Sequence, residues 1–264
     1  MHHDHNDIWP EELVAQMVEM GLFGATIGQE YGGLGLPATT YAKIVARISS
    51  YWMAITGIFN SHLIMAAAVE RFGTAEQKAK WLPKFASGEI RGGLALTEPN
   101  AGSNSLEIET FAAADGAGDG SQGWRLTGQK IWITAVPQAH KLLVIARTKK
   151  LADSKGKTDG LSLFIIDRER DGLTHQAIDK VGTRTLPSSL IYFDNVRVEP
   201  HELVGTLHGG FRELLDVLNT ERVVTSAEAN TFPPGLPVGV VRYSASNVPE
   251  VQPLARLDRL EVVR

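Results

Sequence analysis

The stretch that decides the fold reads Leu94-Ala-Leu-Thr-Glu-Pro-Asn-Ala-Gly-Ser103, and about thirty residues later the chain continues with Gly128-Gln-Lys-Ile-Trp-Ile-Thr134. The first segment passes from an apolar strand into a loop rich in hydroxyls and backbone donors. The second places Trp132 and Thr134 two residues apart on a predicted strand, so we expect both side chains on one face. An indole could cover one face of a flat ring there, while a hydroxyl reaches a ring nitrogen.

Both segments resemble the signatures of the acyl-CoA dehydrogenase family. Its first signature, an apolar residue followed by Thr-Glu-Pro-x-Ala-Gly-Ser-Asp, is matched by residues 96–104 with Asn104 in place of the aspartate. The second, Gly-x-Lys-x-Trp-Ile-Thr, is matched throughout by residues 128–134. Two ordinary strands with a Pro-Gly turn are the alternative, but they leave the joint occurrence of both motifs unexplained. The resemblance extends over about residues 8–229.

Composition places the chain among soluble globular proteins, with 264 residues, 43% hydrophobic and 21% charged. The net charge of -4 and the lack of a long basic run argue against a nucleic-acid partner. No apolar run of about 18 residues suggests a membrane span. The absence of cysteine excludes disulfides and thiolate chemistry. With no visible signal peptide, we expect a cytoplasmic protein.

The segment Met1-His-His-Asp-His5 has several groups that can bind metals. Its spacing fits no standard zinc pattern, and it lies at a terminus, so no metal site is predicted. Compared with members of the family, the chain is expected to begin within a helix-loop segment and to lack the family's first helix.

Residues 8 to about 90 show helical periodicity. We expect helices over residues 10–20, 39–53 and 58–72, with breaks at Gly57 and Gly73. A fourth helix should begin after Thr74, because Thr74 and Gln77 have the spacing of a capping box. The block resembles the family's N-terminal helical domain.

Residues 91 to about 198 change to short strand-like runs, which predict an antiparallel sheet or barrel. The polar connection 147–159 is interpreted as a solvated loop, and the alternative is that one of its lysines meets a CoA phosphate. The predicted strands are 107–113, 124–127, 142–148, 161–167 and 190–193.

After Gly205 the helical pattern returns, with an apolar stripe that continues at helical spacing to Glu221 and Arg222. The pattern ends near Thr231, so we expect a truncated or frame-shifted end. The fold class is therefore α+β, an N-terminal helical domain followed by an antiparallel β-barrel or sandwich-like domain and the start of a helical bundle. The expected domains are 1–90 (helical), 91–205 (β), 206–230 (first bundle helix) and 231–264 (atypical tail).

The resemblance implies roles for individual residues. Thr97 would approach the pyrimidine side of a flavin, Trp132 would pack against its ring, and Thr134 would offer its hydroxyl to the nitrogen that receives hydride. Turn capping for Thr97 and Ser103, and a core position for Trp132, are the alternatives. Implied FAD-binding residues are Leu94, Leu96, Thr97, Ser103, Trp132, Ile133 and Thr134, and implied substrate-binding residues are Ser103, Asn219 and Arg222.

The predicted catalytic base is Glu221, and Arg222 is its predicted partner, which would adjust the pKa and orientation of the carboxylate. Most family members carry the base beyond the bundle, but those resembling isovaleryl- and long-chain dehydrogenases carry a Glu directly before an Arg on a bundle helix. Burial would raise the pKa of Glu221 and Arg222 would lower it. A structural Glu-Arg pair at a helix interface is the alternative.

The family resemblance implies oxidation of an acyl-CoA at Cα–Cβ with FAD, in a homo-oligomer, with electrons passed to an electron-transfer flavoprotein. An oxygen-using acyl-CoA oxidase and an inactive fragment with at most weak flavin or acyl-CoA binding are the alternatives. His140, His175, His201 and His208 have no ligand spacing and are interpreted as surface or turn residues.

Overall fold

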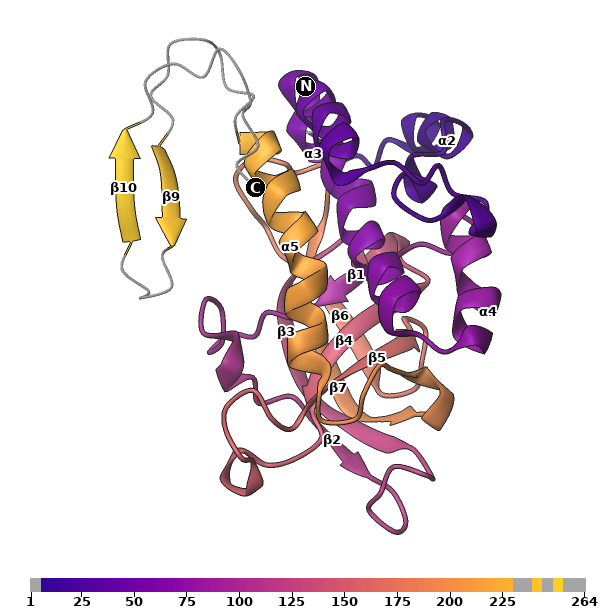
Figure 1. The fold of residues 1–264 in the computed structure, drawn as a ribbon, viewed down its shortest axis with the longest axis vertical. Coiled ribbons are helices and arrows are strands. Elements are labelled where there is room, and N and C mark those ends of the chain that lie inside the picture. The colour runs from indigo at the N-terminus through magenta and orange to yellow at the C-terminus, as the bar shows by residue number, and fades with distance from the viewer. Residues whose placement is uncertain (1–5, 230–238, 244–248, 254–264) are drawn as a thin grey trace.

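The computed structural model describes residues 6–229, 239–243 and 249–253. Its helices are α2 (Glu11–Glu19), α3 (Ala38–Phe72), α4 (Ala75–Ala86) and α5 (Gly210–Ala229), and they gather on one side of a sheet (Figure 1). The predicted α+β architecture is therefore confirmed. The predictions for residues 1–5 and for most of 231–264 lie outside the described residues.

α3 contains the two helices predicted over 39–53 and 58–72. The break between them is at Trp52, whose φ of -159° and ψ of 94° are not helical, and not at Gly57 as the sequence suggested. Gly57 lies inside the second half, where a Cβ atom would come within 2.3 Å of Leu186 Cδ2. The glycine therefore permits close packing against the sheet domain rather than ending a helix.

The predicted capping box of α4 is confirmed. Gln77 N donates to Thr74 Oγ1 at 3.2 Å, and Thr74 N donates to Gln77 Oε1 at 2.9 Å. The same glutamine donates through Nε2 to the carbonyl oxygens of His201 and Leu203, at 2.8 and 2.7 Å. The start of α4 is thus also fastened to the sheet domain.

The main sheet is mixed, whereas the sequence predicted a purely antiparallel one. The strands are β1 (Gly92–Ala95), β2 (Phe111–Ala114), β3 (Trp124–Thr134), β4 (Lys141–Arg147), β5 (Leu161–Asp167), β6 (Leu173–Ala177), β7 (Ser188–Val198) and β8 (Leu203–Val204). Their order in the sheet is β6-β7-β3-β2-β4-β5-β8, and β1 pairs parallel with β4, as β2 does at a single position. The chain between β1 and β4 passes through β2 and β3, so the connection is long enough for parallel pairing.

Strand bounds differ from the predicted runs in several places, and β3 extends beyond the predicted run 124–127 to Thr134. The run 107–113 begins as a 3-10 turn (Ser105–Glu107) and joins the sheet only at Phe111. Before that point, the backbone N–H groups of Glu109 and Thr110 donate to the Glu98 carboxylate and not to a neighbouring strand. The run 190–193 is the middle of the much longer β7, and β6 was not predicted.

The sheet separates two hydrophobic cores. On β4, Leu143 and Ile145 face the helices, while Leu142, Val144 and Ala146 belong to the core on the opposite face. Because both faces are covered, β4 reads as a continuous apolar run instead of an alternating one. On the helical face of the sheet, α3 and α5 lie side by side in contact with each other (Figure 1). α3 also contacts β1, and α5 contacts β5.

By length and composition α3 could cross a membrane, with a mean hydropathy of 1.4 over its most apolar window, but 72% of that window is buried inside the protein.

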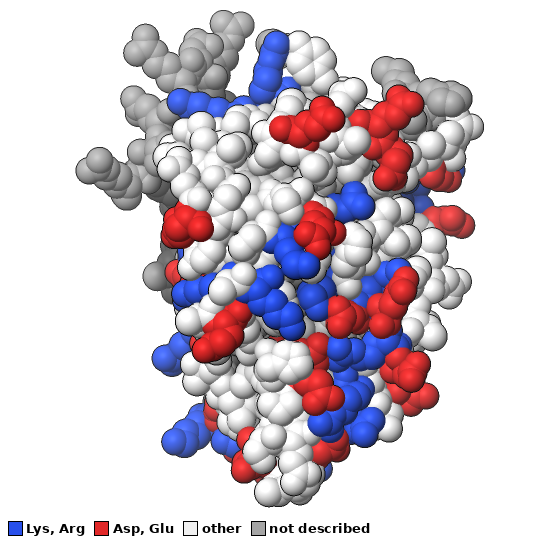
Figure 2. Space-filling view, turned by 90° about the vertical axis from the view of Figure 1, so that its right-hand side faces the viewer, with Lys and Arg blue, Asp and Glu red and all other residues white. Residues whose placement is uncertain are grey.

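Lys and Arg are interspersed with Asp and Glu over much of the face shown in Figure 2, so this face carries no extended region of a single sign. Strands β9 (Gly239–Tyr243) and β10 (Pro249–Pro253) form a separate antiparallel pair.

Candidate active site

Trp132 stands on a β-bulge near the end of β3. The register against β7 shifts between Lys130, which pairs with Ile191, and Ile133, which pairs with Ser189, so one extra residue is accommodated. Trp132 has a φ of 63°, an uncommon conformation for a large side chain. Its indole is 54% exposed although it belongs to a strand with a buried face. The bulge therefore turns a large aromatic surface outward.

The two signature segments are joined directly. Ile131 N donates to Thr97 O at 2.8 Å, and Lys130 Nζ donates to Leu96 O at 3.0 Å. Lys130 Nζ also lies 2.8 Å from Glu98 Oε1, and both side chains are almost completely buried. The Glu of the first motif and the Lys of the second are therefore structural residues that hold the two segments in one register.

Gly128, the first residue of the second motif, is required by close packing. Its φ is +146°, and a Cβ atom there would lie 2.6 Å from Thr110 Oγ1 and 2.7 Å from Thr110 Cα. Thr110 in turn donates to Gln129 O at 3.2 Å. A larger residue at position 128 would push the segment before β2 away from β3, the strand that carries Trp132.

A hollow of about 210 Å³ lies between these motifs, α3 and α5. The Trp-Ile-Thr strand forms one wall, and α5 contributes two carboxylates to the other. α3 supplies a third side, and Ser61 Oγ fastens it to β1 by accepting from Leu94 N at 3.2 Å. The lining residues are Gly57, Asn60, Ser61, Ile64, Leu94, Leu96, Thr97, Trp132, Ile133, Thr134, Glu221 and Glu228.

Seven residues that the sequence singled out meet in this hollow: Leu94, Leu96, Thr97, Trp132, Ile133, Thr134 and Glu221. Ser103, Asn219 and Arg222 are exposed and do not line it. Asn60, Ser61 and Glu228 were not predicted as site residues. The available signal for the first two was their place in the polar triplet Asn60-Ser61-His62, directly before the apolar run Leu63 to Val69.

Comparison with known proteins agrees with this architecture. Residues 1–89 match the family model for the acyl-CoA dehydrogenase N-terminal domain, and residues 93–196 match the model for the middle domain. The chain belongs to the acyl-CoA dehydrogenase family. Members of this family are oxidoreductases that use FAD.

Individual relatives support the same assignment. The chain is 33% identical over 238 residues to (2S)-methylsuccinyl-CoA dehydrogenase of Cereibacter sphaeroides, covering 86% of this chain and 42% of the relative. The glutaryl-CoA dehydrogenase–glutaryl-CoA complex matches with a TM-score of 0.79 and 31% identity, over 87% of this chain and 57% of the other. A glutaryl-CoA dehydrogenase of Mycobacterium smegmatis in complex with FADH2 matches with a TM-score of 0.75 and 27% identity, over 86% and 55%. The chain thus spans about half the length of these relatives.

The residues present fit a flavin of the kind this family uses. The exposed indole of Trp132 offers a flat apolar surface, and Thr97 and Thr134 bring hydroxyl groups to the same hollow. An aromatic ring with polar edges can stack on such a surface and hydrogen-bond at its rim.

Glu221 is one of two carboxylates that α5 contributes to the hollow, and it is the one that the sequence singled out. Burial raises the pKa of Glu221, a hydrogen bond from Thr225 Oγ1 at 3.1 Å lowers it, and the charge of Glu228 raises it again. The net result is a pKa above that of an ordinary glutamate. A carboxylate made more basic in this way is typical of a general base.

Arg222 does not have the predicted effect on Glu221. Its guanidinium lies on the exposed face of α5, where Nη1 donates to Asn219 Oδ1 at 2.8 Å. Successive residues on a helix point about 100° apart, so Glu221 can face the hollow while Arg222 points away from it. Thr225 and Glu228, each on the Glu221 side of the helix, shift the pKa instead.

A second chamber of about 160 Å³ adjoins the hollow and shares Asn60, Ile64 and Glu221 with it. Apolar side chains of α3 and α5, among them Leu63 and Val224, form much of its wall. The hollow and the chamber are therefore neighbours, with Glu221 in the lining of both. An apolar space beside a carboxylate with a raised pKa can accommodate an apolar ligand.

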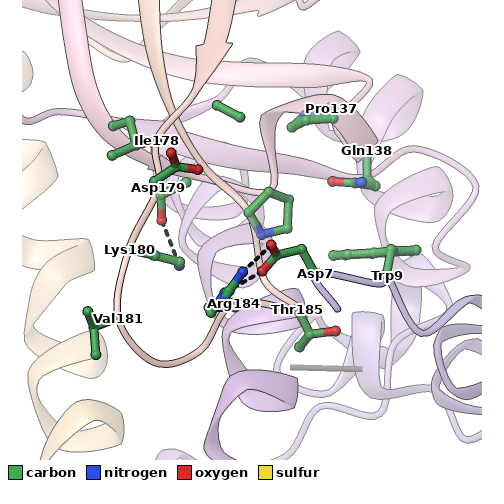
Figure 3. A pocket seen from close by; sticks show the side chains of 13 residues that line it. Asp7, Trp9, Pro137, Gln138, Ile178, Asp179, Lys180, Val181, Arg184 and Thr185 are labelled. Atoms are coloured by element: carbon green, nitrogen blue, oxygen red, sulfur yellow. Dashed lines mark hydrogen bonds and ion pairs between the residues drawn. The ribbon is translucent and has the colours of Figure 1, made fainter. Parts of the chain in front are cut away.

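A larger hollow, of about 520 Å³, lies between the N-terminal segment and the loop after β6 (Figure 3). Asp7 and Arg184 point toward each other across it and form a bidentate pair at 2.7 and 2.6 Å. Lys180 Nζ donates to Ser188 Oγ at 2.9 Å. The sequence-predicted site residues do not line this hollow. The candidate active site is therefore chosen by the chemistry of its lining residues and not by its volume.

The polar connection 147–159 and two of the histidines make structural contacts. Lys149 pairs with Asp159 at 3.2 Å, and Lys157 pairs with Glu107 at 3.2 Å. His208 Nδ1 lies 2.8 Å from Thr148 Oγ1, and His140 Nδ1 accepts from the backbone of Arg91 at 3.0 Å. These contacts favour a structured surface loop, and a contact with a CoA phosphate stays a prediction.

Proposed function

We propose that this protein oxidises the Cα–Cβ bond of an acyl-CoA thioester, with Glu221 as the base. The observation that carries the proposal is that Glu221, with its raised pKa, lines one hollow with Trp132 and Thr134 on the opposite wall. The acyl group would lie between that wall and α5. FAD bound there supplies the acceptor for the hydride that leaves Cβ.

The roles of the chain's own residues follow from this arrangement. The Glu221 carboxylate takes the α-proton, and the electron pair left at Cα forms the new double bond as hydride leaves Cβ. Trp132 supports one face of the flavin ring, and the hydroxyl of Thr134 and the backbone of Thr97 orient its edge. Leu94 and Leu96 keep water from the reacting carbons, which strengthens the interactions of the buried base. Holding base and acyl group in one hollow supplies the proximity that the reaction needs.

The remaining parts of the proposal rest on the family resemblance. Ser103, Asn219 and Arg222 would contact the CoA portion outside the hollow, electrons would pass to an electron-transfer flavoprotein, and the protein would act as a homo-oligomer in the cytoplasm. The relatives named above act on different acyl groups, so the comparisons leave the acyl group open.

The experiment is a spectrum of the purified chain incubated with FAD, followed by anaerobic addition of an acyl-CoA. We expect retained flavin absorbance that is bleached by the thioester, and an acceptor preference for a flavoprotein over oxygen. A preference for oxygen would instead identify an oxidase. A colourless protein that FAD cannot reconstitute would reject the proposal in favour of an inactive chain.

A further inference from the structure

Glu228 is a second carboxylate in the same hollow. It follows Glu221 by seven residues on α5, which places both on one face of the helix about two turns, or ~10 Å, apart. Both line the hollow, and Asn60 of α3 lies in its lining with them. The proton transfer proposed above uses only Glu221, so Glu228 needs another explanation.

Hydrogen bonds from α3 hold the Glu228 carboxylate in place. Asn60 Nδ2 donates to Glu228 Oε1, and Tyr41 Oη donates to Asn60 Oδ1. Asn60 and Tyr41 are both buried, with 5% and 3% exposure. The tyrosine fixes which end of the amide faces Glu228, because an amide oxygen accepts and an amide nitrogen donates. The carboxylate is thus presented to the hollow at a defined position as an acceptor.

The described charged side chains that line the hollow with Glu228 have one sign. The residues that line the hollow include two carboxylates and, among the described residues, no Lys, Arg or His. Two arginines on the helices that flank the hollow are paired elsewhere: Arg71, which lines the adjoining chamber, pairs with Asp216 at 2.6 Å, and Arg222 donates to Asn219. An anionic group entering here would meet two carboxylates and no cationic side chain among the described lining residues. A neutral group that donates a hydrogen bond would find a suitable acceptor.

We propose that Glu228 determines which acyl groups the site accepts, rejecting those that end in a carboxylate and favouring neutral ones, above all those that end in a hydrogen-bond donor. This inference rests on the proposed function, because it assumes that the thioester lies beside Glu221. An acyl group with its Cα at Glu221 that extends along α5 reaches Glu228 within the same hollow. The distance of about two helical turns corresponds to a short acyl group.

The test compares three CoA thioesters that differ only at the far end of a five-carbon acyl group. Valeryl-CoA ends in a methyl group, glutaryl-CoA in a carboxylate, and the ω-amide of glutaryl-CoA in a neutral donor of the same shape as the carboxylate. Binding to the chain, incubated beforehand with FAD, is measured by titration calorimetry. We expect the amide to bind at least as tightly as valeryl-CoA, and glutaryl-CoA at least tenfold more weakly than the amide.

Variants then test which side chain causes the difference in affinity between glutaryl-CoA and its amide. Glu228→Gln removes the charge and keeps the shape, and it should abolish most of the tenfold difference between glutaryl-CoA and its amide. Glu70→Gln removes a carboxylate from the adjoining chamber, and Glu12→Gln removes one from the surface of α2. Both should leave the difference unchanged. The comparison of glutaryl-CoA with its amide on the unmodified protein is informative even if Glu228→Gln does not fold.

The outcomes separate this inference from the proposed function. Equal binding of glutaryl-CoA and its amide to the unmodified protein would overturn the role of Glu228 while leaving the acyl-CoA site intact. So would a loss of discrimination in Glu70→Gln with none in Glu228→Gln. Failure of all three thioesters to bind would instead reject the proposed function itself.

Discussion

Lys130 Nζ lies 2.8 Å from Glu98 Oε1, and this buried pair joins the two segments that carry the active-site wall. Burial lowers the pKa of Lys130 to about 8, against the opposing effect of Glu98. Burial also acts to raise the pKa of Glu98, but Lys130, Thr110 and the amide of Glu109 outweigh it and leave that pKa below the usual value. The pair thus acts as a clamp between the Thr-Glu-Pro loop and the Trp-Ile-Thr strand.

Glu98→Ala should destabilise the protein by about 3–5 kcal/mol, because it leaves the Lys130 ammonium buried without its partner. It also removes the acceptor for the backbone N–H groups of Glu109 and Thr110. The measurement is urea-induced unfolding near pH 7. Glu107→Ala, which breaks the exposed pair with Lys157, is the control and should cost less than about 1 kcal/mol. Equal costs for the two variants would contradict the clamp.

His62 should make stability depend on pH. It is completely buried between Phe23 and Phe85, with Nε2 3.1 Å from Phe85 O, and burial lowers its pKa from 6.5 to about 4. Between these values the unfolded chain binds a proton that the folded chain does not. The contribution of His62 to the free energy of unfolding is therefore at its full value above pH 6.5 and decreases as the pH falls toward 4. At 1.36 kcal/mol per pH unit, the decrease from this group is roughly 3 kcal/mol.

The check is a series of unfolding curves between pH 7 and pH 4 for the protein and for His62→Gln. The variant is expected to be less stable at pH 7 but to show a shallower fall in stability on acidification, because its side chain does not titrate. Parallel curves for the two proteins would show that His62 does not contribute to the slope.

Trp132→Ala should weaken FAD binding by at least tenfold while changing the stability of the flavin-free protein by less than about 1 kcal/mol. The indole is 54% exposed, so little packing is lost when it is removed. A core tryptophan would behave in the opposite way, with a loss of about 3–5 kcal/mol. Tyr192→Ala, an exposed aromatic on β7 outside the hollow, should leave the FAD dissociation constant unchanged.

Glu221→Gln should lower the rate of flavin reduction by an acyl-CoA by about 10²–10⁴-fold, because the variant cannot accept the α-proton. In the unmodified protein the rate should fall as pH decreases through the pKa of Glu221, which burial raises above the usual 4.5. The measurement is stopped-flow absorbance as a function of pH. Asp216→Asn, on the same helix but paired with Arg71 at the surface, should retain the rate. A normal rate in Glu221→Gln would mean that another group is the base.

Sequence patterns predicted the structure correctly where the signal lay in neighbouring residues. The capping box at Thr74 requires only neighbouring residues, and it formed as predicted. The strand character of β4 and β5 follows from short apolar runs that both cores bury. The family signature likewise identified the Trp-Ile-Thr wall, because its residues are contiguous in the chain.

Sequence patterns failed where a partner distant in the chain decided the outcome. Gly57 reads as a helix break, but contact with Leu186 keeps it inside α3 and the break falls at Trp52. Arg222 is a failure of another kind: it follows Glu221 directly, but the helix turns its guanidinium toward Asn219, three residues away, and toward solvent.

By itself, the sequence determined the family, the order of helical and β regions and the residues of one active-site wall, because each of these is written in adjacent residues. Only the tertiary structure decided which groups face that wall. Asn60 and Glu228 are separated by 168 positions in the chain and meet because α3 packs against α5. Such long-range contacts depend on the packing of whole elements, which no local pattern encodes.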